Sequence, residues 1–198
     1  MCFTFPKWYP CPKMSHPNQK QDHKLPFKAL TFAAHKHRHQ HRKGVDKIPY
    51  INHPIAVANL LVDVGNVTDI ETIAAALLHD TIEDTETTLL ELEDEFGATV
   101  ANLVAELSDD KSLPSEKRKR LQIEHAPTLS SRARLIKLAD KTCNLRDVVG
   151  DPPKGWSLKR KQEYFDWGKS VVDLIRGTND ALEHAFDAAF SKRPGRTR

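Results

Sequence analysis

Two histidines and two aspartates are the residues of this sequence best suited to chemistry: His53, the adjacent pair His79 and Asp80, and Asp140. Three of the four sit in segments whose pattern predicts a buried helix, where an ionisable side chain costs on the order of several kcal/mol unless it is paired or metal-bound. Imidazole nitrogens and carboxylate oxygens together suit Zn²⁺, Mn²⁺ or Fe²⁺, and the residue types do not choose among these ions. We therefore predict a divalent metal site held by these four residues.

The segment HDTIED adds two carboxylates beside the predicted ligands. If the helix containing His79 and Asp80 continues, Glu83 and Asp84 each lie one turn further along it. With a metal present, either carboxylate could orient or deprotonate a water whose acidity the metal increases. In the simpler alternative, Asp80 is an ordinary carboxylate in the last turn of a helix and His53 only precedes a proline that starts one. We favour the metal site because all these motifs occur together.

The elements that must position these residues are helices. The chain has 198 residues, 39% of them apolar and 29% charged, which is typical of one globular domain. Runs of strict apolar and polar alternation are absent, so we predict an all-α fold. We expect a disordered or loosely attached tail over 1–24, one domain over 25–191 and a basic tail over 192–198. Helices are predicted at 25–43, 54–64, 69–78, 88–96, 98–107, 114–125, 132–149, 157–175 and 178–190.

Composition narrows the classes of protein to which the chain can belong. The sequence contains no apolar run long enough to span a membrane and no signal peptide pattern at its start. Three cysteines, Cys2, Cys11 and Cys143, form no disulfide framework, which indicates a reducing compartment and a cytoplasmic protein. A net charge of +3 is compatible with an anionic ligand without requiring one.

Four segments resemble a known family: PYINHP at 49–54, AALLHDTIEDT at 75–85, FGATVANLVAELSDDK at 96–111 and IKLADKTCNLRD at 136–147. They are similar to the HD-domain hydrolases of the RelA/SpoT group, above all to the small single-domain alarmone hydrolases of the metazoan SpoT homologue type. The resemblance covers about residues 27–190. It implies an HD-domain helical bundle with a metal site at its centre. The implied reaction is hydrolysis of the 3′-diphosphate of (p)ppGpp to GDP or GTP and pyrophosphate, usually with Mn²⁺.

The resemblance also implies a role for individual residues. It assigns metal binding to His53, His79, Asp80 and Asp140, catalysis to Glu83 and Asp84, and substrate binding to Arg42, Lys43, Asn144, Arg160 and Tyr164. One departure is that the family often carries a glycine just before the PYI segment, where this chain has residues 45–48. Base preference is therefore the open part of the assignment. Animal members are also associated with removal of the 2′-phosphate of NADPH, which makes NADPH an alternative substrate.

Other classes of function fit the sequence less well. A non-catalytic module that binds guanine nucleotides would not need the Glu83 and Asp84 pair. An RNA-binding protein could use the basic run 117–120, but most such runs are solvated helix surface and the net charge is small. We interpret the histidines of HKHRHQH (35–41), which are spaced four apart, as a solvated helix face rather than a second metal site. The expected partner is a small nucleotide, with neither nucleic acid nor membrane; the sequence does not indicate an oligomeric state.

Overall fold

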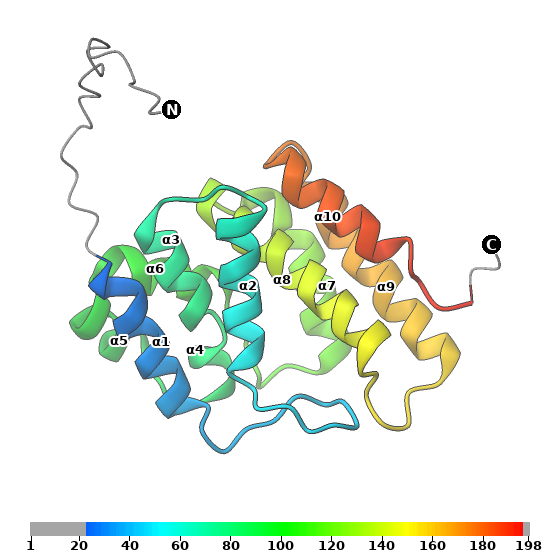
Figure 1. The fold of residues 1–198 in the computed structure, drawn as a ribbon, viewed down its shortest axis with the longest axis horizontal. Helices are drawn as coiled ribbons and strands as arrows, with labels where there is room; N and C mark the ends of the chain where they lie inside the picture. Colours follow the sequence, from blue (N-terminus) through cyan, green and yellow to red (C-terminus); the bar gives the residue numbers. More distant parts are fainter. Residues whose placement is uncertain (1–22, 196–198) are drawn as a thin grey trace, which may run out of the picture.

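The computed structural model describes residues 23–195, and Figure 1 shows their arrangement as a bundle of helices. Within this range there is no β-strand, only an isolated bridge between His41 and Pro49, so the predicted all-α class is confirmed. The α-helices are α1 (Lys24–Lys36), α2 (Asn52–Asp63), α3 (Ile70–Leu78), α4 (Thr81–Asp84), α5 (Leu89–Phe96), α6 (Ala98–Leu107), α7 (Ser115–His125), α8 (Ser131–Gly150), α9 (Leu158–Val172) and α10 (Asp180–Phe190). Short 3₁₀ turns occur at Ala126–Thr128 and Asp173–Ile175.

The longest helix, α8, is the centre of the bundle. It starts at the cap residue Ser130, whose side chain accepts a hydrogen bond from the Ala133 amide at 3.2 Å. The helices α2, α3, α6, α9 and α10 all pack against it, with α2 and α3 on one side and α9 on the other (Figure 1). Its apolar residues Ile136, Leu138 and Leu145 are buried. Any polar residue in the middle of α8 therefore lies inside the protein.

The helix α3 is apolar on nearly all sides, as predicted for a central helix. Its last five residues, Ala74 to Leu78, are buried, and α1, α2 and α6 all contact it. The three consecutive alanines allow these neighbours to approach closely. The end of α3 at Leu78 thus places the residues that follow, His79 and Asp80, at the centre of the bundle.

The prediction for the first helix is wrong at its end, because α1 stops at Lys36 rather than near residue 43. Residues 37–51, here called the α1–α2 loop, run below the bundle in Figure 1. The His37 side chain is buried, with its Nδ1 2.7 Å from Gln40 Oε1 and its ring stacked on that of Tyr50. This burial turns the chain inward and ends the helix. The predicted helix face is therefore absent, although His35, His39 and His41 are exposed to solvent as predicted.

Two further features of the described residues bear on the predictions. Lys47 in the α1–α2 loop has φ 49°, a left-handed conformation that favours glycine, and it lies in the segment where the resembling family often has one. No helix in residues 23–195 is both long enough and apolar enough to span a membrane. The predicted first tail lies outside this range except for residues 23 and 24, and α1 begins at Lys24, within that tail; of the predicted second tail, residues 196–198 lie outside it.

A single side chain ties α10 to the connection between α2 and α3. Asn179 caps α10 by accepting a hydrogen bond from the Leu182 amide at 3.0 Å, and its Nδ2 donates to the Gly65 carbonyl at 3.0 Å. We expect Asn179→Ala to lower the free energy of unfolding by about 1–2 kcal/mol, because a cap and a second hydrogen bond are lost. Asn179→Ser, which keeps a capping oxygen, should lose less. Denaturant titration measures both values, and an alanine variant as stable as the wild type would refute this role.

Candidate metal centre and its pocket

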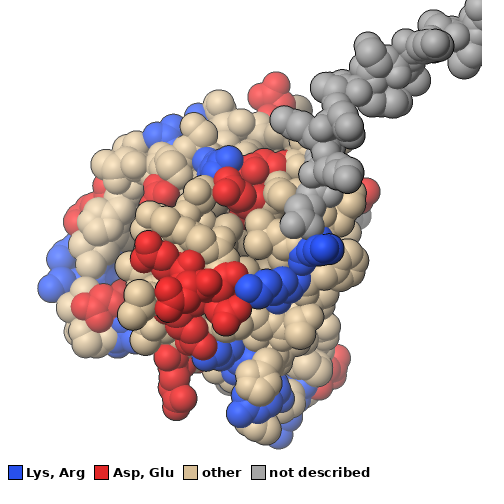
Figure 2. Space-filling view, turned by 90° about the vertical axis from the view of Figure 1, so that its left-hand side faces the viewer, with Lys and Arg blue, Asp and Glu red and all other residues tan. Residues whose placement is uncertain are grey.

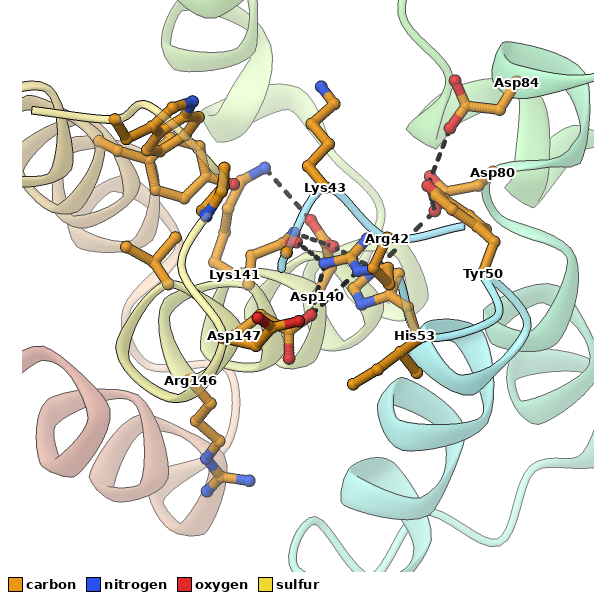
Figure 3. Close-up of a pocket in the computed structure, with 18 of the residues that line it drawn as sticks. Arg42, Lys43, Tyr50, His53, Asp80, Asp84, Asp140, Lys141, Arg146 and Asp147 are labelled. Carbon is orange, nitrogen blue, oxygen red and sulfur yellow. Dashed lines mark hydrogen bonds and ion pairs between the residues drawn. The ribbon is translucent and has the colours of Figure 1, made fainter. Parts of the chain in front are cut away.

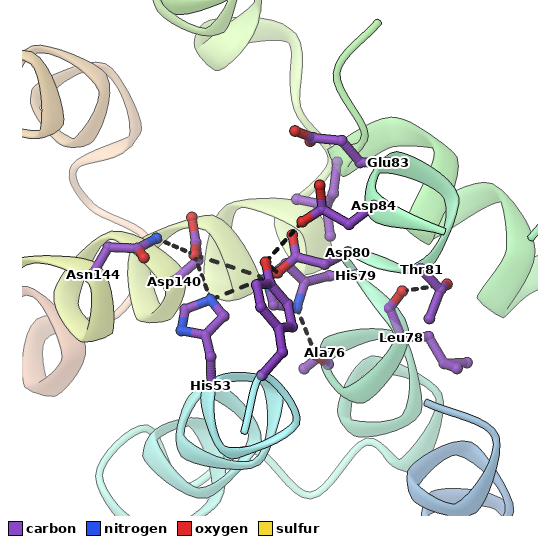
Figure 4. A network of polar contacts seen from close by, with 12 residues as sticks. His53, Ala76, Leu78, His79, Asp80, Thr81, Glu83, Asp84, Asp140 and Asn144 are labelled. Atoms are coloured by element: carbon purple, nitrogen blue, oxygen red, sulfur yellow. Dashed lines mark hydrogen bonds and ion pairs between the residues drawn. The ribbon is translucent and has the colours of Figure 1, made fainter. Parts of the chain in front are cut away.

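The four predicted ligands meet at one point, although they come from three separate parts of the chain (Figure 4). His53 lies in the first turn of α2, His79 and Asp80 lie between α3 and α4, and Asp140 lies in the middle of α8. His53 Nε2 is 3.1 Å from Asp140 Oδ1, and His79 Nε2 is 3.2 Å from Asp80 Oδ2. The other two distances between imidazole and carboxylate are both 3.8 Å. Two nitrogens and two oxygens therefore surround a common centre.

This set of donors fits a divalent metal ion. One ligand atom from each of His53, His79 and Asp80 lies within 4.8 Å of the others. His79 Nδ1 is 2.8 Å from the carbonyl of Ala76, a contact that fixes the ring and leaves Nε2 for a metal. His79 Nε2 is buried and has no hydrogen-bond partner of its own. A buried nitrogen of this kind beside two carboxylates is what a site of mixed nitrogen and oxygen ligands requires.

The electrostatics of the cluster favour positive charge. Burial lowers the pKa of His79, but the neighbouring Asp80 and Asp140 outweigh burial and raise the pKa to about 10. Burial would raise the pKa values of both aspartates, yet His79 lowers that of Asp80 and Lys141 lowers that of Asp140, so that both lie below the usual range. Burial lowers the pKa of His53, which favours the neutral imidazole that ligates metals. The carboxylates thus stay ionised and attract a cation.

Asp140 is held in place by its own helix. Asn144, one turn later, donates from Nδ2 to Asp140 Oδ1 at 2.5 Å, and Lys141 Nζ lies 3.2 Å from Oδ2. Lys141 is itself buried, with its ammonium 4.3 Å from the centre of the Trp167 ring on α9. These contacts fix the orientation of the carboxylate at the centre of the site.

The two carboxylates of α4 lie beside the cluster (Figure 4) and have largely different hydrogen-bond partners. Glu83 faces α7: its Oε2 accepts a hydrogen bond from the Asp109 amide at 3.2 Å, and its Oε1 lies 3.3 Å from Arg118 Nη1. Asp84 instead accepts a hydrogen bond from Tyr50. Lys111 forms an ion pair with both carboxylates, and its Nζ lies 3.5 Å from Glu83 Oε1. Burial and the charge of Asp109 raise the pKa of Glu83. A carboxylate with a raised pKa is a stronger base and therefore a better proton acceptor.

Tyr50 connects the cluster to this pair of carboxylates. Its hydroxyl lies 2.7 Å from Asp80 Oδ2 and 2.8 Å from Asp84 Oδ2. Its ring lies between the His37 ring, 4.8 Å away, and the Arg42 guanidinium, 5.4 Å away. Tyr50 is a site residue that the sequence did not predict, because a tyrosine between a proline and an isoleucine carries no local sign of its polar partners.

All eleven residues predicted for the site line one pocket of about 1390 Å³. Arg42 reaches into it from the α1–α2 loop, where its Nη2 is 2.6 Å from Asp147 Oδ2 and 2.7 Å from Asn144 Oδ1 (Figure 3). Lys43 is exposed, and its side chain extends away from the Arg42 and Asp147 pair (Figure 3). The structure thus brings Arg42 and Asn144 together and leaves the Lys43 ammonium apart from them.

The wall that α9 provides is aromatic. Tyr164 lies between Trp156 and Trp167, each with a ring centre 5.3 Å from its own. The Arg160 guanidinium stacks on Trp156 at 4.7 Å. The predicted substrate-binding residues Arg160 and Tyr164 therefore both contact Trp156 and line the same pocket.

Charge is distributed unevenly over the molecule. Acidic side chains gather on the side where α1 and α5 lie (Figure 2), and α5 alone carries four of them, Glu91, Glu93, Asp94 and Glu95.

Ten lysines and arginines line the pocket, against nine aspartates and glutamates. One of them, Arg118, belongs to the basic run that we expected to be solvated, yet its side chain is only 24% exposed and faces Glu83, whereas that of Arg120 is 66% exposed.

The fold and the site define a class of protein, the helical HD domains that carry a histidine and aspartate cluster for a metal. The family model described as HD domain matches residues 29–166. The chain therefore belongs to the HD-domain family. This confirms the predicted HD-domain bundle.

Individual relatives show where within this family the chain belongs. The guanosine-3′,5′-bis(diphosphate) 3′-pyrophosphohydrolase MESH1 of Danio rerio is 54% identical over 167 residues, which are 84% of this chain and 93% of that protein. The MESH1 protein of Homo sapiens gives the same identity and coverage. The GTP pyrophosphokinase rsh of Brucella melitensis is 42% identical over 82% of this chain, but the match is only 22% of that longer protein.

A solved structure agrees with these relatives. The protein presented as a metazoan ortholog of SpoT that hydrolyzes ppGpp superposes with a TM-score of 0.83 and 48% identity, covering 86% of this chain and 96% of that one. The predicted resemblance to the metazoan SpoT homologues is thereby confirmed.

The cluster predicts how the chain responds to loss of one ligand. Loss of a residue that only hydrogen-bonds to a metal ligand weakens metal binding roughly 10–100-fold. We expect Asp80→Ala, which removes a ligand itself, to weaken Mn²⁺ binding by more than this. Titration calorimetry on metal-stripped protein measures the affinity. Asp63→Ala, at the exposed end of α2, is the matched control and should bind as the wild type does. Equal affinity of Asp80→Ala and wild type would remove Asp80 from the site.

Proposed function

We propose that the protein is a metal-dependent hydrolase that removes the 3′-diphosphate from (p)ppGpp and releases pyrophosphate with GDP or GTP. One observation carries the proposal: the cluster of two histidines and two aspartates shares its pocket with the Glu83 and Asp84 pair. The relatives that are named for this reaction match the chain over 93% of their length. We expect the enzyme to act on this small nucleotide in the cytoplasm.

We propose that His53, His79, Asp80 and Asp140 hold the metal, and that the metal is Mn²⁺. A divalent cation bound there would polarise a phosphoryl oxygen and make a nearby water more acidic. Mixed imidazole and carboxylate ligands also accept Zn²⁺ and Fe²⁺, so the preference for Mn²⁺ rests on the family resemblance.

In the proposed reaction, Glu83 takes the proton from the attacking water. The water oxygen bonds to the phosphorus next to the ribose, the bond from that phosphorus to the 3′ oxygen breaks, and the 3′ oxygen recovers a proton as a hydroxyl group. Burial raises the pKa of Glu83, which suits it to this role. Asp84, held by Tyr50 and Lys111, orients the reacting groups.

The remaining predicted residues hold the nucleotide in this proposal. A pocket of about 1390 Å³ exceeds the usual range of roughly 300–1,000 Å³ for small ligands, and a nucleotide with two diphosphates is a large one. Arg42 and Lys43 provide positive charge for phosphates, and Asn144 offers an amide. Arg160 and Tyr164 supply a cation and an aromatic surface next to Trp156.

The decisive experiment incubates metal-stripped protein with ppGpp or with NADPH, with and without Mn²⁺, and measures pyrophosphate and phosphate separately. Pyrophosphate released from ppGpp only with Mn²⁺ is the expected result. Release of phosphate from NADPH, with no product from ppGpp, would show that the same site acts on another substrate. Nucleotide binding without any product would indicate a non-catalytic module instead.

Removal of the proposed base predicts a loss of rate without a loss of metal. Glu83→Gln keeps the size of the side chain but cannot accept a proton, so we expect kcat for ppGpp to fall by about 10²–10⁴-fold. Mn²⁺ affinity, measured by calorimetry, should remain within about twofold of the wild type because Glu83 is not among the proposed ligands. An unchanged kcat would exclude Glu83 from the mechanism.

The raised pKa of Glu83 predicts a shift in the dependence of rate on pH. The carboxylate is the active form, so kcat/KM falls as the pH drops through this pKa. The charge of Asp109 raises the pKa, and Asp109→Asn should therefore move the acidic limb of the profile to lower pH. Asp110→Asn, at an exposed neighbouring position, is the control and should leave the profile in place. Coinciding profiles for Asp109→Asn and wild type would contradict this role of Glu83.

A further inference from the structure

The polar face of α8 extends beyond the metal cluster. Asp140, Asn144 and Asp147 follow one another at helical spacing, and Asp151 continues the series directly after the helix ends. We call these four residues the α8 stripe. Asp140 lies at the metal end, and Asn144 and Asp147 bind the Arg42 side chain. The stripe thus joins the metal cluster to the α1–α2 loop.

The last residue of the stripe binds the backbone of that loop. Asp151 Oδ1 accepts a hydrogen bond from the Val45 amide at 2.7 Å and a longer one from the Asp46 amide at 3.4 Å. These contacts bridge more than a hundred residues of sequence. They attach the part of the loop that directly follows Arg42 and Lys43 to the end of α8.

Gly44 makes this attachment possible. A Cβ atom at position 44 would lie 1.8 Å from Asp151 Oδ2 and 2.2 Å from its Cγ, far closer than two atoms can approach. Any other residue at position 44 would therefore displace the carboxylate from the loop. Only glycine at position 44 allows the backbone to approach the Asp151 side chain this closely.

We propose that Asp151 is a positioning residue that sets where Arg42 and Lys43 stand in the nucleotide pocket, an inference that rests on the proposed function. Asp147 fixes the end of the Arg42 side chain, while Asp151 fixes the backbone just beyond Lys43. One attachment in the last turns of α8 and one at the residue that directly follows the helix determine both the place and the direction of this segment. The loop conformation includes the left-handed Lys47, which few L residues adopt unless their surroundings enforce it.

The test separates substrate positioning from metal chemistry. For Asp151→Ala we expect KM for ppGpp to rise about tenfold while kcat stays within about twofold, because an interaction that only holds the substrate-binding loop is lost. Asp151→Asn keeps an acceptor oxygen and should restore most of the KM. Gly44→Ala, which expels the carboxylate without removing it, should reproduce the effect of Asp151→Ala. Asp63→Ala serves again as the control with wild-type constants.

Two further measurements show whether the effect passes through the loop. In an Arg42→Ala, Lys43→Ala background, Asp151→Ala should raise KM no further, because the residues it positions are gone. Hydrogen exchange should show the Val45 amide protected in the wild type and exposed in Asp151→Ala. Additive effects on KM, or a KM for Asp151→Ala equal to that of the wild type, would overturn the proposal. If the wild type does not hydrolyse ppGpp, the proposed function fails, and the same KM comparison on whichever nucleotide it does hydrolyse decides the role of Asp151.

Discussion

The buried carboxylate of Asp140 is the constraint on which the rest of the structure depends. It lies in the middle of the helix against which most of the others pack, where an unpaired charge would be prohibitively unstable. Lys141 and Asn144 satisfy it from its own helix, and His53 and His79 approach from α2 and from the end of α3. The arrangement of the bundle around α8 is therefore also the arrangement of the metal centre.

Much of this could be predicted from the sequence because the ligands sit on helices with strong apolar patterns. The buried alanines and leucines of α3 determine the position of His79 at the end of that helix. The buried apolar residues of α8 determine how that helix is oriented, and therefore where Asp140 lies. Motif and periodicity agree at these positions, so local and global preferences point to the same structure. The different hydrogen-bond partners of Glu83 and Asp84 come from residues 109 and 118 and from Tyr50, and no spacing within HDTIED encodes them.

The α1–α2 loop could not be predicted for a physical reason. Between Lys36 and Gly44 the sequence contains neither glycine nor proline, and its lysine, arginine and glutamine residues have fair helix propensity, so nothing before Gly44 marks an end. Its conformation is decided by the burial of His37 and by Asp147 and Asp151, which follow more than a hundred residues later. Arg118 was missed in the same way, because a run of four basic residues does not reveal which one faces a carboxylate.

The metal cluster and the α1–α2 loop differ in how well they tolerate substitutions. The histidines and aspartates of the cluster stand on packed helices, where a shift of one ligand disturbs the core as well as the metal. Arg42 and Lys43 stand on a loop that is attached through a few hydrogen bonds at the far end of α8. In the proposed function the cluster would act on one phosphoryl group, which many nucleotides share, whereas the loop would bind parts of the substrate away from that group. A change of substrate within this architecture would therefore arise in the α1–α2 loop and leave the metal chemistry intact.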